Sequence, residues 1–315
     1  QTPARVVDIL FVGFELDTLE VRLHELDDVV DEFVLFEGMY TQRGNRKPLY
    51  FAASENRFAH FLPKITRLVQ DATSEKDFGG VRKDDDNDMD DWRNENTMRG
   101  LAVQKYLSMH SEEEVRASLF IQGDLDEIPG REAIQKFKFC QPIDDSLNFY
   151  YTFLHGTADV VRPQVNAHEK EYWIHGGVRN GEWLLTNPHK FRFVNTMYEA
   201  SSGGYHLSRI MNPYGWILKL FALAEVDRAN GKRKLHCAQL ILNPVAYWRE
   251  CVIRVDDLSG SVQPGWEHPW KDEWVLKRFE DWDGMYSRAR SWVIEQNPDR
   301  YPWAHAATFG SVSDV

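Results

Sequence analysis

An apolar run that ends in carboxylates is the part of the sequence best suited to chemistry. Residues 119–121 have the composition of a buried strand in a parallel sheet, and Pro129 ends that strand, so we expect Asp124 and Asp126 at its carboxyl end. Open α/β sheets bind ligands at this edge. An Asp-x-Asp pair leaves most of the coordination sphere of Mg²⁺ or Mn²⁺ open to phosphate oxygens and water. The pattern suggests a metal site for a diphosphate leaving group, and solvated acids at a strand end are the alternative.

Alternating strand and helix patterns should position this acidic segment. Residues 6–14 and 31–37 are predicted strands, and between them lies a helix with a partly apolar face. This spacing is typical of a βαβ unit, in which the two strands are parallel. A further strand is predicted at residues 146–154. We therefore predict an α/β protein with a Rossmann-like, mainly parallel sheet flanked by helices.

Four more side chains are candidates for the same edge of the sheet. Glu15 and Glu37 each follow a predicted strand, where a carboxylate can accept from a uracil N–H or a sugar hydroxyl, and helix capping or pairing with an arginine is the alternative. Arg99 lies four residues after Glu95 in a helix predicted at residues 91–109, so it either forms a surface ion pair or turns toward a nucleotide. His206 follows two glycines that let the backbone approach a ligand, and its imidazole is a metal donor.

The composition describes a globular protein and limits its partners. Of 315 residues, 49 are acidic and 37 basic, which gives a formal net charge of −12. This balance argues against a nucleic acid or an anionic membrane surface as the main partner. Because a nucleotide sugar is also anionic, a metal would have to supply the attraction. No apolar run of about 18 residues is present, so no membrane contact is expected within this chain. The three cysteines do not decide the compartment.

The sequence resembles glycosyltransferase family 17, the family of the bisecting N-acetylglucosamine (GlcNAc) transferases. The resemblance rests on four segments. They are residues 14–31, Lys47-Pro48-Leu49-Tyr50-Phe51, Asp124-x-Asp126-Glu127-Ile128-Pro129 and Gly204-Tyr205-His206-x-Ser208. The family usually has Gly-Trp-His where this chain has Gly-Tyr-His, so an aromatic residue is kept.

The resemblance implies a GT-A fold and an inverting transfer of GlcNAc from the donor UDP-GlcNAc. It also implies Mn²⁺ or Mg²⁺ as cofactor, and a glycan or glycoprotein acceptor such as the β-mannose of an N-glycan core. By position, Asp124 and Asp126 match the family's metal-binding pair, and Asp124 also lies toward the nucleotide. His206 matches a histidine that is a third metal contact. Lys219 matches a lysine that neutralises a phosphate.

The resemblance also suggests the general base, whereas the domain division follows from the absence of an internal repeat or a convincing flexible linker in the sequence. Glu127 is the first candidate base, Glu225 the second and Asp159 a remote third, and the alternative for Glu127 is a structural carboxylate that holds the turn. Residues 1–230 are the expected nucleotide-sugar-binding and catalytic region, and residues 231–315 are a C-terminal extension packed on the same domain. The family implies a Golgi or other secretory lumen, as the soluble catalytic region of a membrane-anchored protein, with a cytoplasmic location as the alternative.

Two other functions use similar residues. Phosphohydrolases of the haloacid dehalogenase type also place an aspartate pair after an apolar strand, but usually on the first strand of the fold. A non-catalytic carbohydrate-binding protein is suggested by the many tryptophans, although most of them are better explained as core.

Overall fold

The protein is an α/β structure built around a six-stranded mixed sheet. The computed structural model describes residues 3–42, 46–70, 88–140, 146–155, 172–173, 176–188 and 203–208. In this part of the chain the order of the larger sheet is β3-β2-β1-β4-β9-β6. The first four strands are parallel, and β9 is antiparallel to both of its neighbours. The strands are β1 (Arg5–Val12), β2 (Glu32–Glu37), β3 (Ile65–Val69), β4 (Ser118–Gln122), β6 (Ser146–Asn148) and β9 (Gly177–Asn180). The predicted α/β class is confirmed.

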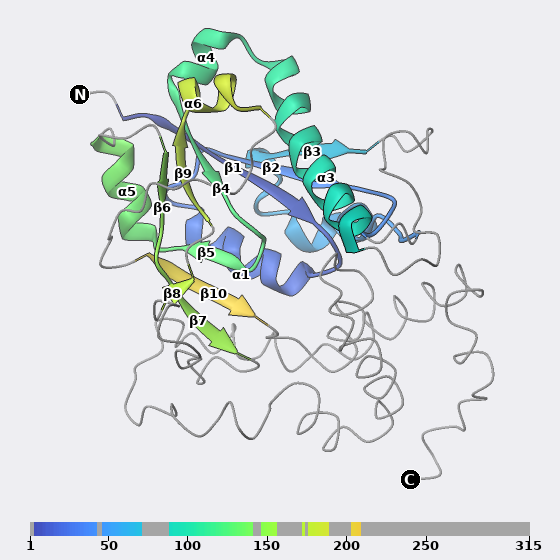
Figure 1. The fold of residues 1–315 in the computed structure, drawn as a ribbon. Coiled ribbons are helices and arrows are strands. Elements are labelled where there is room, and N and C mark those ends of the chain that lie inside the picture. The colour runs from blue at the N-terminus through green and yellow to red at the C-terminus, as the bar shows by residue number, and fades with distance from the viewer. Residues whose placement is uncertain are drawn as a thin grey trace, which may run out of the picture.

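Helices cover both faces of this sheet (Figure 1). The long helix α3 lies on one face, and α1 lies on the other. The described helices are α1 (Leu16–Leu26), α2 (Tyr50–Ala53), α3 (Asp88–Met109), α4 (Glu112–Arg116), α5 (Arg131–Phe139) and α6 (Gly181–Thr186), with short 3₁₀ turns at Glu55–Phe58 and Leu62–Lys64. No helix in these ranges is long and apolar enough to cross a membrane.

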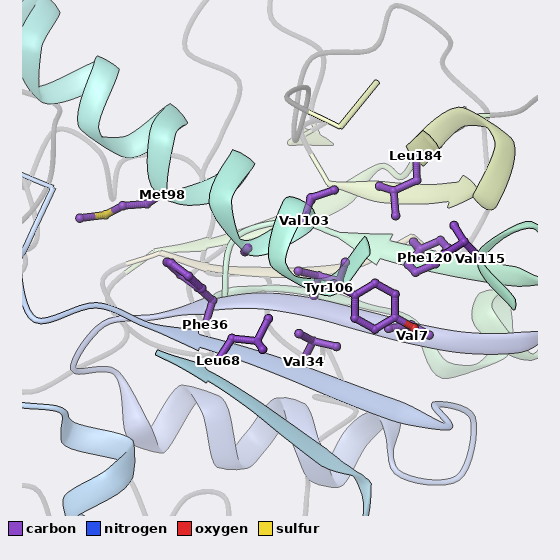
Figure 2. Close-up of a cluster of buried hydrophobic side chains, with 12 residues drawn as sticks. Val7, Val34, Phe36, Leu68, Met98, Val103, Tyr106, Val115, Phe120 and Leu184 are labelled. Atoms are coloured by element: carbon purple, nitrogen blue, oxygen red, sulfur yellow. The ribbon is translucent and has the colours of Figure 1, made fainter. Parts of the chain in front are cut away.

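An apolar core lies between α3 and the sheet (Figure 2). Successive residues of a strand point to opposite faces, so Val7 and Ile9 of β1 pack in this core while Asp8 between them faces α1. The members of the core are Val7, Ile9, Val34, Phe36, Leu68, Met98, Ala102, Val103, Tyr106, Val115, Phe120 and Leu184. This packing fixes α3, and therefore Arg99, relative to β1 and β4.

A second, smaller sheet continues from the end of β4. Its order is β5-β10-β7-β8, and its strands are β5 (Glu127–Pro129), β7 (Tyr151–His155), β8 (Tyr172–Trp173) and β10 (Gly204–Ser208). The single strand predicted at residues 146–154 is wrong, because β6 belongs to the larger sheet and β7 to the smaller one. Phe149 and Tyr150 between them are buried like β6, so the apolar pattern does not mark the break.

The strand order creates a switch point between β1 and β4. The chain passes from β1 to β2 and β3 on one side, and β4 lies on the other side of β1. In open α/β sheets the ligand crevice lies at the carboxyl ends of the strands at such a point. The acidic residues that follow β4 therefore stand at the edge where a ligand is expected.

Candidate active site

The acidic loop joins the two sheets. It runs from Gly123 to Asp126, and a tight turn closes it because the Glu127 N–H donates to the Asp124 carbonyl at 2.9 Å. The Leu207 N–H donates to the Asp126 carbonyl at 2.8 Å, which ties the loop to β10. The loop is thus held at both ends by regular structure.

Strand β10 brings His206 beside Asp126. His206 Nε2 lies 3.6 Å from Asp126 Oδ2, and both side chains are almost completely buried. The preceding glycine permits this approach, since Gly204 has φ +111° and a Cβ there would lie 2.1 Å from the Ile128 carbonyl oxygen of β5. The structure therefore explains this glycine by close strand packing. It also places together two of the three residues predicted as metal ligands.

Arg99 links α3 to the first aspartate of the pair. One Arg99 Nη lies 2.6 Å from Asp124 Oδ1, and the same nitrogen contacts Glu95 one turn earlier in the helix. The Arg99 side chain is 4% exposed and that of Asp124 is 31% exposed. Arg99 therefore forms the predicted pair with Glu95, but in a buried position, and it also reaches the acidic loop.

Arg22 of α1 holds the backbone of the acidic loop in place through its carbonyl oxygens. It forms a two-point ion pair with Asp8 of β1, with both distances 2.8 Å and both side chains fully buried. Its Nη1 also donates to the carbonyl oxygens of Asp124 at 2.9 Å and of Glu127 at 2.7 Å. Burial alone would lower the pKa of Arg22, but the facing Asp8 carboxylate outweighs it and the pKa is raised. The loop geometry thus depends on a permanently charged guanidinium.

Glu127 has the structural role that was the alternative for it. Its side chain is fully buried, and its Oε2 accepts from the Asp124 N–H at 2.9 Å. The carboxylate also packs against Gly123, where a Cβ would lie 2.9 Å from Oε2. A carboxylate in this position holds the turn.

Glu37 also has a structural role. It is fully buried at the end of β2 and accepts from the backbone N–H groups of Phe51 at 2.8 Å and Ala52 at 3.3 Å. These are first-turn groups of α2, so the helix-capping alternative is the one that the structure shows. Burial raises the pKa of Glu37. Glu15 stands at the N-cap position of α1, three residues after the end of β1.

Three predicted site residues lie outside the described residues. They are Lys219, Glu225 and the remote candidate Asp159. The predicted boundary at residue 230 lies there as well, so the domain division stays a prediction.

The donor atoms around the acidic loop fit a divalent metal in kind. Carboxylate oxygens and a neutral imidazole suit Mn²⁺, and Mg²⁺ sites often use only one or two protein carboxylates with substrate phosphates and water. Within the described ranges, no group of three or more His, Cys, Asp or Glu side chains is close enough to hold a metal ion. Asp126 and His206 are adjacent, whereas Asp124 contacts Arg99.

Comparison with known proteins identifies the family. The sequence model of glycosyltransferase family 17 matches residues 1–194, more than half of the chain. The chain belongs to glycosyltransferase family 17. It is 31% identical over 249 residues to a β-1,4-mannosyl-glycoprotein 4-β-N-acetylglucosaminyltransferase of Rattus norvegicus, and 27% identical over 249 residues to the protein of that name in Homo sapiens. Each match covers 72% of this chain and 44% of the relative, so the chain spans less than half the length of these relatives.

The family 17 match includes most of the described site. Arg22, Arg99 and the acidic loop lie within residues 1–194, whereas His206 lies beyond them. Asp8 was not among the predicted site residues. A charge inside the otherwise apolar strand is the signal that could have revealed its buried partner Arg22.

Proposed function

We propose that this chain transfers GlcNAc from UDP-GlcNAc to a glycan acceptor, with inversion at the sugar C1 and with a divalent metal. The family 17 assignment carries this proposal. The acidic loop supports it, because Asp124 and Asp126 follow β4 at the switch point of the sheet. The curated relatives are named as N-acetylglucosaminyltransferases, which is the reason for choosing this sugar.

The donor would lie across the carboxyl ends of β1 and β4, in a GT-A fold. The parallel order β3-β2-β1-β4 and the second sheet after β4 are compatible with that fold. Asp126 and His206 would hold Mn²⁺ or Mg²⁺, with Asp124 beside them. The metal, when bound, would supply positive charge to the diphosphate leaving group.

The residues of the chain have separate tasks in this proposal. Arg22 keeps the loop backbone in place, and Arg99 orients Asp124 through its ion pair. In the transfer, the acceptor oxygen bonds to C1 as the bond from C1 to the phosphate oxygen breaks, and a base takes the hydroxyl proton. Since Glu127 is buried and holds the turn, we propose Glu225 as the base.

The acceptor and the location come from the relatives. Their name specifies a β-1,4-mannosyl-glycoprotein, so we propose an N-glycan core as acceptor and a Golgi or other secretory lumen as the location.

A transfer assay tests the proposal. The chain is incubated with UDP-GlcNAc, Mn²⁺ and an N-glycan that carries an exposed core β-mannose, and the glycan mass is measured. The proposal requires a gain of one GlcNAc that EDTA abolishes and that Asp126→Asn reduces at least 100-fold. An unchanged glycan mass, with hydrolysis of a phosphomonoester in the same preparation, would favour the phosphohydrolase alternative.

A further inference from the structure

Lys47 is a buried ammonium group at the carboxyl edge of the sheet. It follows β2 by ten residues and is 4% exposed. Its Nζ lies 3.5 Å from the Gly13 carbonyl oxygen and 3.4 Å from that of Pro48, and it stands 5.3 Å from the centre of the Tyr50 ring. Both oxygen contacts are at the long limit of hydrogen bonding.

These contacts do not compensate a buried charge. An ammonium removed from water requires close oxygen partners or an opposite charge. Among the described residues, no carboxylate lies within ion-pair distance of Lys47 Nζ. The Glu37 carboxylate attracts the Lys47 ammonium from a greater distance, but its oxygens accept hydrogen bonds from backbone N–H groups in the first turn of α2. Burial accordingly lowers the pKa of Lys47 to about 8.

The position of Lys47 indicates where a compensating anion would be. Gly13 directly follows β1, and Asp124 follows β4, the strand hydrogen-bonded to β1. Lys47 therefore stands on the β1 side of the switch point, and Arg99 with Asp124 stands on the β4 side. An anionic ligand bound across this edge would meet Lys47.

We propose that the Lys47 ammonium binds the diphosphate of the nucleotide donor. This inference rests on the proposed function, because it takes the donor to be a nucleoside diphosphate sugar. A lysine ammonium binds phosphate as a compact point charge, without the bidentate geometry of arginine. Such a charge matters in a chain with a formal net charge of −12, which repels an anionic donor at long range.

Calorimetric titration distinguishes the loss of a contact with the diphosphate from a change in the structure that weakens binding of the whole nucleotide. UDP and uridine are titrated with Mn²⁺ into the whole chain as wild type, Lys47→Met and Lys138→Met. Lys138 is the matched control, because it pairs with Asp31 before β2, at the opposite edge of the sheet. We expect Lys47→Met to weaken UDP binding at least tenfold and to leave uridine binding unchanged, while Lys138→Met alters neither. Unchanged UDP binding in Lys47→Met, or an equal loss for uridine, overturns the inference.

A second measurement needs no variant. If the phosphate stabilises the charged form of Lys47, UDP binding to the wild type at pH 8.5 takes up protons, which titrations in two buffers of different ionisation enthalpy reveal. Binding without proton uptake overturns the inference even if Lys47→Met fails to fold. Absence of any UDP binding to the wild type would instead count against the proposed function, so the two failures are distinguishable.

Discussion

Arg22 shows how one residue connects stability to the site. Its guanidinium pairs with the buried Asp8 and donates most closely to the carbonyl oxygens of Asp124 and Glu127. Arg22→Met leaves Asp8 as a buried charge without its partner, so we expect the free energy of unfolding in urea to fall by about 3–5 kcal/mol.

A double variant separates the two tasks of Arg22. Asp8→Leu together with Arg22→Met removes both charges, and we expect it to recover most of the lost stability. UDP affinity should stay low in the double variant, because the carbonyls of Asp124 and Glu127 still lack their donor. If both the free energy of unfolding and the UDP affinity recovered fully in the double variant, Arg22 would not be needed to position the loop.

Glu127 provides a test of the base assignment. Its Oε2 accepts from a backbone N–H, and a glutamine oxygen can accept the same hydrogen bond. We expect Glu127→Gln to keep the transfer rate within about tenfold of wild type, whereas loss of a general base costs about 10²–10⁴-fold. Single-turnover rates of Glu127→Gln and Glu225→Gln provide the comparison. A rate loss of about 10²–10⁴-fold for Glu127→Gln would instead indicate that Glu127 is the general base.

The lowered pKa of Lys47 predicts that the free energy of unfolding depends on pH. Its folded pKa of about 8 lies below the ordinary lysine value of 10.5, so between these values the unfolded state binds more protons and stability rises with pH. Relative to Lys47→Met, the wild type should gain about 3 kcal/mol across this window, at 1.36 kcal/mol per pKa unit. Urea unfolding of both proteins at pH 7.5 and 10.5 measures the gain. A constant difference between them would show that Lys47 titrates normally.

At the scale of elements, the site depends on the docking of β10 against β5. A Cβ on Gly204 would lie 2.1 Å from the Ile128 carbonyl oxygen, in a backbone conformation that L residues rarely adopt. Gly204→Ala should therefore push β10 away, lower the midpoint of thermal unfolding by several degrees and weaken metal-dependent UDP binding. Gly13→Ala is the control for thermal unfolding alone, since a Cβ there meets Glu15 at an ordinary 3.5 Å. Equal shifts of the unfolding midpoint in the two variants, or unchanged UDP binding in Gly204→Ala, would contradict the proposed role of β10.

The elements with clear patterns could be predicted from the sequence. The predicted strands at 6–14 and 31–37 and the helix at 91–109 appear as β1, β2 and α3, with ends that differ by a few residues. The strands are nearly continuous apolar runs, and α3 carries the apolar residues Met98, Ala102, Val103 and Tyr106 at helical spacing, so local composition indicates these elements. The division of residues 146–154 between two sheets could not be predicted, because it depends on which strand each half meets.

The site could be predicted only in part, for a related reason. A short motif places Asp124 and Asp126 at a strand end, and the structure brings His206 beside Asp126. The pairs Arg22 with Asp8 and Arg99 with Asp124 join residues that are 14 and 25 positions apart. Whether Glu37 caps a helix or faces a ligand was likewise undecidable before the fold placed α2 above it.

At the scale of the whole molecule, charge is distributed unevenly. The chain carries a formal net charge of −12, yet the switch point holds the buried cations Arg22, Arg99 and Lys47. Arg22 and Arg99 are matched by carboxylates, whereas Lys47 is not matched within ion-pair distance among the described residues. An anionic donor would therefore be attracted locally, by Lys47 and a bound metal.

The most direct test is calorimetric titration of UDP into the wild-type chain and into Asp126→Asn, each with and without Mn²⁺. Asparagine keeps the size of the side chain, so a thermal unfolding curve close to wild type would serve as the control for folding. The account predicts UDP binding by the wild type that requires Mn²⁺ and that falls at least tenfold in Asp126→Asn. UDP binding of equal strength in both proteins, or no binding by the wild type with Mn²⁺, would contradict the assignment of the acidic loop as the donor site.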